Sequence, residues 1–267
     1  MRPSARDIAV IAVTVALLIG GQALFAALPG VEVVTVVLLS FSWSFGAARG
    51  MLTATAYSLL RCFFFGFDAK TVVLYLLYFN FFACLFGVLG GRGGGKAGAA
   101  GAKAEKEGKG EKEKEKISPL SAVFTEGLFL ALCVLAAAVL SDAVRVSVLL
   151  QTGLNILAWV LLFIASAGAV AYNILLFFSR KYPACAAAAQ TVAAAAAAAV
   201  CTVLFTLLDD ALYPLFYGVR GEAAVAYFYA SFTAMLPQTV CALVSVSILF
   251  RPLTRVFRRF ATPRSGR

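Results

Sequence analysis

Long apolar segments, separated by short polar breaks, run along the whole chain. Runs such as 8–28 and 154–178 reach the ~20 residues that an α-helix needs to cross the hydrocarbon core of a bilayer, and they contain almost no ionisable side chains. A transmembrane β-barrel needs ~10-residue segments that alternate apolar and polar, whereas these runs are apolar on all faces and rich in Ala and Leu. The pattern therefore predicts an all-α fold, a polytopic bundle of transmembrane helices.

Gly, Pro and charged residues mark the ends of eight candidate spans. The second and third spans are short, so six well-formed spans are an alternative. The eight predicted spans cover residues 8–28, 31–46, 50–66, 71–90, 119–140, 152–178, 184–209 and 224–250.

The segment between the fourth and fifth spans is built from Gly, Ala, Lys and Glu. It has no apolar face to bury, so it predicts a disordered cytoplasmic linker. The predicted organisation is N-terminal transmembrane helices over 1–90, the linker over 91–118, C-terminal transmembrane helices over 119–250 and a basic cytoplasmic tail over 251–267.

Composition and charge agree with a membrane location. Of 267 residues, 62% are hydrophobic and 13% charged, far from the balance of a soluble domain. If the eight spans cross the membrane in turn, nearly all of the 23 Lys and Arg residues lie on the same side as the N-terminus. Lys70, Arg145 and Arg220 lie on the outside, and Arg61 lies within a span. By the positive-inside rule, both termini are cytoplasmic. We predict a multi-pass protein of a bacterial plasma membrane that binds no nucleic acid.

Several chemistries are disfavoured by the residues present. The chain has no histidine, and its six cysteines lie in apolar runs without a CxxC pair, which argues against metal sites and His-based catalysis. Gly90–Lys96 fits the G-x-x-x-x-G-K pattern, but Ala97 replaces the Ser or Thr of a P-loop. We predict no enzymatic activity, no cofactor and no metal, so any dependence on ATP must come from a partner.

Polar residues inside the spans are the candidates for function, because a charge in hydrocarbon costs ~2.5 kcal/mol or more. In the predicted orientation they gather toward the outer leaflet and indicate a pocket open to the outside. The acids could instead mark the water interface, and Arg61 could extend to it or form a structural ion pair with Glu32. The residues are Glu32, Arg61, Asp209 and Asp210, with Asn80 and Gln238 deeper in the membrane.

Tyrosines accompany these positions. Interfacial belts use tyrosine routinely, but rings near carboxylates also suit a flat, partly apolar ligand. Pro237 kinks its helix and frees a backbone carbonyl next to Gln238, which is a second candidate ligand contact; a passive kink is the alternative. The tyrosines are Tyr75, Tyr78, Tyr213, Tyr217, Tyr227 and Tyr229.

Seven short segments surround the candidate residues. They are Leu28–Thr35 (LPGVEVVT), Phe45–Gly50 (FGAARG), Leu60–Gly66 (LRCFFFG), Leu207–Pro214 (LLDDALYP), Tyr229–Phe232 (YASF), Leu236–Gln238 (LPQ) and Phe250–Leu253 (FRPL). Together they resemble the S component, the membrane substrate-binding subunit, of an energy-coupling factor (ECF) transporter.

This resemblance implies a function and partners. S components bind a vitamin or metal ion from outside and associate with a transmembrane coupling subunit and two cytoplasmic ATPases. The family's A-x-x-x-A strip on the first helix, which contacts the coupling subunit, falls on Ala12 and Ala16. S components usually have six helices, so spans five and six are an additional pair. The absence of histidine argues against the nickel and cobalt members.

We therefore predict a membrane substrate-binding subunit for a small organic micronutrient such as a vitamin or precursor. A self-sufficient proton-coupled transporter using Glu32 or Asp209–Asp210 is the alternative, and a scaffold or membrane enzyme is a third class. The predicted ligand-site residues are Glu32, Thr35, Arg61, Tyr78, Asn80, Asp209, Asp210, Tyr213, Tyr229 and Gln238.

Overall fold

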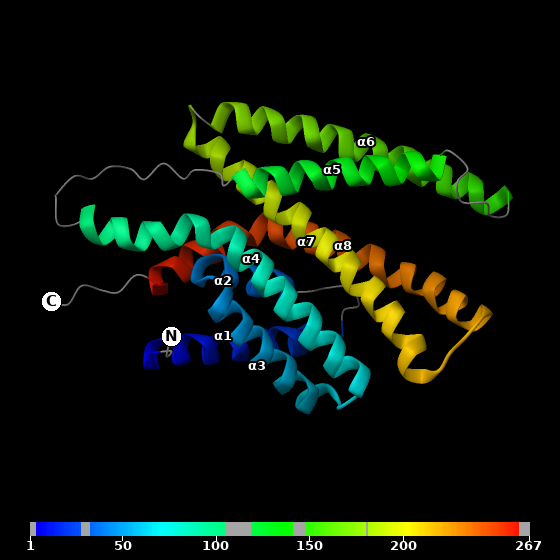
Figure 1. Ribbon diagram of the computed structural model, residues 1–267, viewed down its shortest axis with the longest axis horizontal. Coiled ribbons are helices and arrows are strands. Elements are labelled where there is room, and N and C mark those ends of the chain that lie inside the picture. Colours follow the sequence, from blue (N-terminus) through cyan, green and yellow to red (C-terminus); the bar gives the residue numbers. More distant parts are fainter. Residues whose placement is uncertain (1–3, 28–32, 105–118, 141–147, 180, 262–267) are drawn as a thin grey trace. The chain divides into compact units, whose positions relative to one another are not determined.

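The protein is described by a computed structural model over residues 4–27, 33–104, 119–140, 148–179 and 181–261, and within these ranges the regular elements are helices (Figure 1). Each of the eight predicted spans corresponds to one helix. The helices are α1 (Ala5–Leu24), α2 (Val34–Phe45), α3 (Ala47–Phe65), α4 (Ala69–Ala104), α5 (Pro119–Leu140), α6 (Val148–Ser179), α7 (Pro183–Tyr217) and α8 (Glu222–Ala261).

Three helices run well beyond their predicted spans, and one of them is α7, which continues past residue 209 to Tyr217 through Pro214. α4 continues to Ala104, inside the predicted 91–118 linker, although six of residues 91–104 are glycine, which disfavours the helical backbone; no proline interrupts the run. Residues 105–118 of that linker lie outside the described residues. α8 continues to Ala261 through Pro252, and its last turn carries Arg258 and Arg259, cations that the C-terminal end of a helix dipole favours.

Membrane-spanning length is met by four helices of the described ranges: Ala5–Leu24, Ala69–Gly90, Pro183–Tyr217 and Pro237–Ala261. Shorter apolar helices occur at Val34–Phe45, Ala122–Val134 and Ala165–Ser179. Over the residues that the structure describes, the chain is thus all-helical with apolar helices of the kind that membrane proteins use. The count of eight crossings and the cytoplasmic termini stay predictions.

The helices form two compact units. The first unit comprises Met1–Lys112 and Ala198–Arg267, and the second comprises Glu113–Ala197. The first unit therefore contains α1 to α4, the C-terminal part of α7 and α8, whereas the second contains α5, α6 and the start of α7. The boundary on the C-terminal side falls within α7, so the two units differ from the two halves on either side of the linker.

α2 forms the core of the first unit. Its residues from Val34 to Trp43 are all buried, because α2 packs against α1, α3, α4 and α8. Two glycines of α4 allow close packing: a Cβ on Gly87 would lie 2.3 Å from the backbone N and Cα of Ala47, and a Cβ on Gly90 would lie 2.4 Å from the carbonyl oxygen of Trp43. The absence of a side chain at these positions lets α4 approach α2 and α3 closely.

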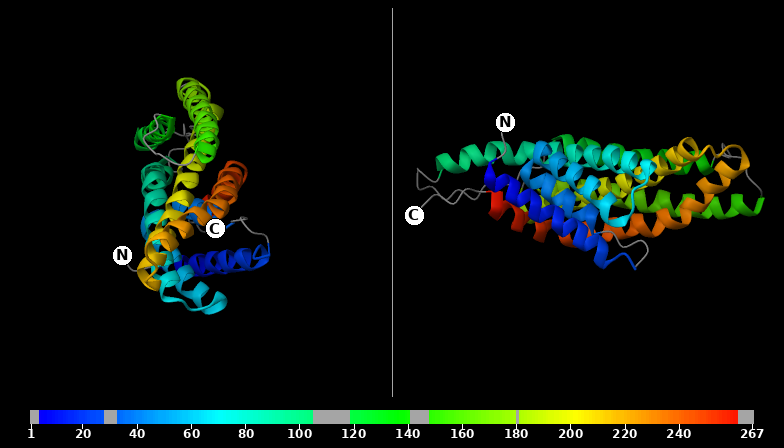
Figure 2. Two further views of the ribbon diagram at one scale, coloured as in Figure 1. Left: turned by 90° about the vertical axis from the view of Figure 1, so that its right-hand side faces the viewer. Right: turned by 90° about the horizontal axis from the view of Figure 1, so that it is seen from below.

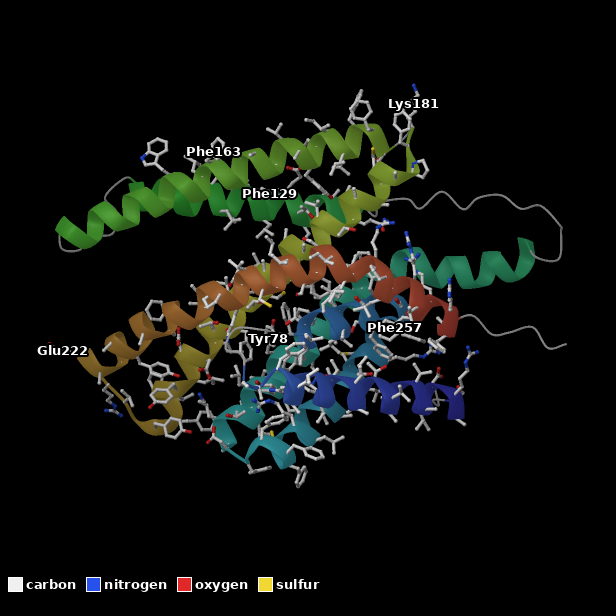
Figure 3. All side chains as sticks on the ribbon, turned by 180° about the vertical axis from the view of Figure 1, so that it is seen from behind. Tyr78, Phe129, Phe163, Lys181, Glu222 and Phe257 are labelled. Atoms are coloured by element: carbon white, nitrogen blue, oxygen red, sulfur yellow. The ribbon has the colours of Figure 1, made fainter. Side chains whose placement is uncertain are left out.

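Aromatic contacts join α2 to α8. The ring of Phe257 meets Phe41 edge-on with centroids 5.6 Å apart, and Phe250 meets Trp43 in the same way at 5.4 Å. Phe257 lies on the C-terminal part of α8 (Figure 3). Edge-to-face pairs of this kind add stabilisation beyond the area that they bury. They fix the C-terminal part of α8 against the buried helix.

The second unit is held by packing of α5 on α6 (Figure 2). Gly168 of α6 lies under the ring of Phe129, where a Cβ would come within 2.8 Å of the ring. Tyr172 is buried against Ala189 and Ala193 of α7. The small alanine side chains leave room for the tyrosine ring.

Candidate functional site

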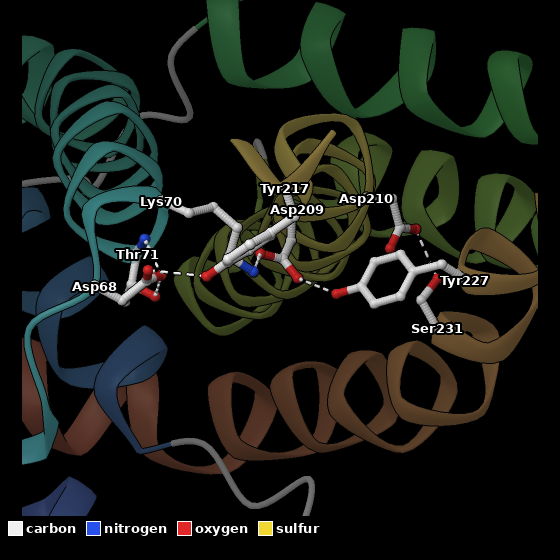
Figure 4. Close-up of polar contacts among 8 residues, drawn as sticks. All are labelled: Asp68, Lys70, Thr71, Asp209, Asp210, Tyr217, Tyr227 and Ser231. Atoms are coloured by element: carbon white, nitrogen blue, oxygen red, sulfur yellow. Dashed lines mark hydrogen bonds and ion pairs between the residues drawn. The ribbon is translucent and has the colours of Figure 1, made fainter. Parts of the chain in front are cut away.

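Charged and hydroxyl side chains from three helices meet at one end of the first unit. We call the eight residues the polar cluster (Figure 4). They come from the connection into α4 and its first turn, from the C-terminal part of α7, and from the N-terminal part of α8. The polar cluster consists of Asp68, Lys70, Thr71, Asp209, Asp210, Tyr217, Tyr227 and Ser231.

The α3–α4 connection positions the first members of the cluster. α3 ends at Phe65, and the φ of +106° at the following Gly66 suits glycine and turns the chain toward α4. Asp68 then caps α4: its Oδ2 accepts hydrogen bonds from the backbone N–H of Thr71 at 3.0 Å and from the Thr71 hydroxyl at 2.9 Å. An N-cap aspartate of this type satisfies a free N–H of the first turn. Lys70 is thereby held in the first turn of α4, next to α7.

An ion pair joins α4 to α7. Lys70 Nζ donates to Asp209 Oδ1 at 2.7 Å, with side-chain exposures of 13% and 25%. The same ammonium lies 5.3 Å from the centroid of the Tyr213 ring. The second oxygen of Asp209 accepts from the Tyr227 hydroxyl of α8 at 3.2 Å. Both carboxylate oxygens of Asp209 therefore have partners.

Asp210 has a different environment. Successive residues of a helix point in directions about 100° apart, so Asp210 does not share the partners of Asp209. Its side chain is only 7% exposed, and its Oδ2 accepts from the Ser231 hydroxyl at 2.6 Å. Its Oδ1 is buried and has no hydrogen-bond partner. Asp210 is thus a buried carboxyl group with one free acceptor, which normally requires a ligand or a proton.

Three tyrosine rings line the same region. The rings of Tyr213 and Tyr227 stack with centroids 3.9 Å apart and an interplanar angle of 6°. Tyr217 lies 4.9 Å from Tyr213, and its hydroxyl donates to Asp68 Oδ1 at 2.9 Å. The stack joins α7 to α8, and the Tyr217 hydrogen bond joins α7 to the α3–α4 connection. The cluster is therefore cross-linked by polar contacts among all three segments.

Asp68 gives a direct probe of these contacts. The hydrogen bond from Tyr217, followed by those from Thr71, lowers the pKa of Asp68 below its ordinary value. Because the folded pKa is the lower one, the contribution of these contacts to stability is present above the unfolded pKa and is lost as the pH falls through the folded pKa.

Tyr217→Phe should therefore raise the pKa of Asp68 toward its ordinary value, since the largest favourable contact of the carboxylate is removed. A titration of ¹³C-labelled aspartate by NMR in detergent micelles measures this shift. Tyr182→Phe, in the α6–α7 connection, is the matched control and should leave Asp68 unchanged. An unchanged pKa in Tyr217→Phe would show that the contact does not form.

A cationic and aromatic region lies on the neighbouring helices. The guanidinium carbon of Arg61 on α3 is 4.1 Å from the centroid of Tyr75 on α4. Tyr75 and Tyr78 contact the ring of Phe205 on α7, with centroids 5.7 and 4.8 Å apart. Arg61 thus lies over an aromatic face, a favourable position for a cation.

The predicted site residues fall into four groups. The structure brings Asp209, Asp210 and Tyr213 together, and it places Arg61 and Tyr78 on the aromatic contacts described above. Asn80 accepts a hydrogen bond from the Thr55 hydroxyl of α3 at 2.9 Å, and Thr35 is buried in α2; Gln238 is half-buried on α8. Glu32 and the side chain of Tyr229 lie outside the described residues, so the proposed Glu32–Arg61 pair stays a prediction.

Six members of the polar cluster are not among the predicted ligand-site residues. The sequence pattern places Lys70 among the cations on the outer side. In the predicted topology Lys70, at the outer start of span four, lies at the same depth in the membrane as Asp209, at the outer end of span seven. Asp68 stands two residues before it, in the pattern of a helix N-cap. The six are Asp68, Lys70, Thr71, Tyr217, Tyr227 and Ser231.

Comparison with known proteins gave no matching family model, no matching curated protein and no matching solved structure. Within the described ranges, no group of three His, Cys, Asp or Glu side chains is placed to hold a metal ion. The fold and the cluster define an all-helical protein with apolar helices of membrane-spanning length and a buried carboxyl group beside stacked tyrosines. Such a site suits recognition of a small molecule by hydrogen bonds and ring contacts.

Proposed function

We propose that this chain is a multi-pass membrane protein and the substrate-binding subunit of an ECF-type importer. It captures a small organic micronutrient from outside, and partner subunits drive its uptake with ATP. The observation that carries this proposal is the polar cluster: a salt bridge, a buried carboxyl group and stacked tyrosines at the end of a unit made of apolar helices. Ionisable groups in such surroundings are retained mainly where they bind or transport a solute.

The division into units supports the same proposal. The first unit contains six helices in whole or in part, namely α1 to α4, α7 and α8. S components usually have six helices, and α5 and α6 then form the additional pair. The polar cluster lies within the six-helix unit, where the ligand site of a substrate-binding subunit is expected.

α1 supplies the proposed contact with the coupling subunit. Ala12 and Ala16 are exposed on α1, as are Ala5 and Ala9 one and two turns earlier. Small side chains at this spacing form a flat strip on which another helix can pack closely. The strip is separate from the polar cluster, so partner binding and ligand binding can be changed independently.

Replacing both Ala12 and Ala16 with leucine should reduce recovery of the coupling subunit at least about tenfold, since overpacking a helix interface by two large side chains costs more than ~1.4 kcal/mol. Quantitative mass spectrometry of the purified complex measures this. Ala167→Leu/Ala171→Leu on α6, the same spacing of exposed alanines in the second unit, is the control and should assemble normally. Undiminished assembly of the α1 variant would refute the assigned interface.

The second candidate is a self-sufficient proton-coupled transporter. The observation that favours it is Asp210, because a buried carboxyl group with a free oxygen can carry a proton. The two functions differ in their energy source. An importer subunit depends on ATP hydrolysed by partners, whereas a proton-coupled carrier works alone and stops when the proton gradient is dissipated.

Solute uptake measures this difference directly. In cells that express the chain with its ECF partners, depletion of ATP should abolish uptake, and a protonophore that leaves ATP intact should not. Purified chain alone in proteoliposomes should bind solute but not accumulate it. Accumulation by the lone chain that collapses with the proton gradient would establish the second candidate instead.

A further inference from the structure

We propose that the ligand of the polar cluster is a small organic cation, an ammonium or amidinium whose N–H groups reach the free oxygen of Asp210. This inference rests on the proposed function, because it names the substrate class of the same site. It does not depend on whether uptake is driven by ATP or by protons.

The charges of the cluster are unbalanced. Asp68, Asp209 and Asp210 are acidic, and Lys70 is the one basic member of the cluster. Asp68 is satisfied by Tyr217 and Thr71, and Asp209 by Lys70 and Tyr227. Asp210 has only the neutral hydroxyl of Ser231. Asp210 is therefore the one carboxyl group of the cluster that is more than nine-tenths buried, and it also keeps an oxygen without a hydrogen-bond partner.

The groups around Asp210 would favour a positive charge. Asp209 precedes it on α7, while Tyr227 and Ser231 face it from α8, and Figure 4 shows its carboxyl group beside the Tyr227 ring. Lys70, the nearest cation of the cluster, is bound to Asp209. An anionic ligand would meet two carboxylates, and a neutral ligand would leave the charge of Asp210 to be neutralised by a proton. A cation avoids the repulsion and neutralises the Asp210 carboxylate directly.

The cluster already binds one ammonium in the way that we propose for the ligand. The Lys70 ammonium is held by the Asp209 carboxylate at 2.7 Å and lies 5.3 Å from the Tyr213 ring. Asp210 offers a second carboxylate, and Tyr227, stacked on Tyr213, offers a second ring. A carboxylate combined with a tyrosine ring is the usual arrangement for recognising an organic cation.

Three probes of similar size and different charge test this proposal: benzylammonium, benzyl alcohol and benzoate. Each is titrated at neutral pH into the full-length protein in detergent micelles, and the unfolding temperature is measured, because a ligand that binds only the folded state raises it. Benzylammonium should raise the unfolding temperature with a saturable dependence on concentration, and the other two should not. Equal stabilisation by benzyl alcohol or benzoate, or no stabilisation by benzylammonium, would overturn the proposal.

Asp210→Asn removes the charge and keeps the shape of the side chain. The apparent affinity for benzylammonium should fall at least about tenfold, the usual effect of losing a charge-assisted hydrogen bond. Asp7→Asn, in the first turn of α1 and outside the cluster, should bind as the unmodified protein does. Unchanged affinity in Asp210→Asn would overturn the proposal. If that variant does not fold, the charge series on the unmodified protein decides.

The outcomes separate the two proposals. Purification of the chain with its ECF partners, combined with no preference for the cation, would leave the proposed function in place and refute the ligand class. A clear preference for the cation in a chain that purifies without those partners would support the ligand class and refute the proposed function.

Discussion

Gly87→Ala should lower the unfolding temperature of the protein substantially, although it adds only one methyl group. The new Cβ would lie 2.3 Å from the backbone N and Cα of Ala47 and 2.8 Å from the backbone carbonyl carbon of Gly46. Backbone atoms cannot rotate away as a side chain can, so α4 must move from α3 and lose contacts with α2. Overpacking of this kind costs about 1–3 kcal/mol. Thermal unfolding in detergent measures the change. The progress of unfolding is monitored by the labelling of the thiols of Cys62 and Cys201, which are buried in the folded protein.

Gly20→Ala on α1 is the matched control. A Cβ at this position meets nothing within 4 Å, and alanine favours the helical backbone by roughly 0.5–1 kcal/mol over glycine. The control should therefore unfold at the same or a slightly higher temperature. Equal behaviour of the two variants would refute the close contact between α3 and α4.

Lys70→Met should destabilise the protein by on the order of 2–3 kcal/mol and loosen the end of the first unit. Removing one partner of a buried ion pair leaves an uncompensated charge, at a cost of ~3–5 kcal/mol when burial is complete. Lys70 and Asp209 retain 13% and 25% of their side-chain exposure, which reduces the cost. The double variant Lys70→Met/Asp209→Leu should recover most of the loss, because both charges are then absent. A double-mutant cycle of unfolding free energies gives this coupling.

The chain contains a second ion pair that serves as a comparison. Arg49 and Asp7 are 3.2 Å apart, but the Arg49 side chain is 44% exposed. Arg49→Met should therefore change stability much less than Lys70→Met, since water screens an exposed pair. A similar loss in both variants, or no recovery in the double variant, would mean that the Lys70–Asp209 pair does not tie α4 to α7.

The positions of the helices could be predicted from the sequence because they depend on local properties. The length of each apolar run and the Gly, Pro or charge at its ends are sufficient to identify each of the eight helices. The ends of α4, α7 and α8 are less predictable. α4 continues through a glycine-rich run in which no proline follows Gly90, and α7 and α8 continue through Pro214 and Pro252, where the sequence pattern predicts a helix end.

The candidate site could be predicted only in part. Asp209 and Asp210 stand out because they interrupt an apolar helix. Lys70 lies 139 residues away from Asp209, and Ser231 lies 21 residues from Asp210, so their contacts depend on which helices pack together. Nothing local in the sequence distinguishes Ser231 from other serines in apolar helices. The difference between Asp209, which has an ion partner, and Asp210, which has none, likewise exists only after the helices have assembled.

The central claim is that this chain is the substrate-binding subunit of an ECF-type importer. Affinity purification of the tagged chain from native membranes, with mass spectrometry of proteins and bound small molecules, tests it most directly. We predict recovery of a transmembrane coupling subunit and two ATPases, together with a small organic solute bound to the chain. Recovery of the chain without a coupling subunit or ATPases, from cells whose uptake of the solute collapses with the proton gradient, would contradict the claim.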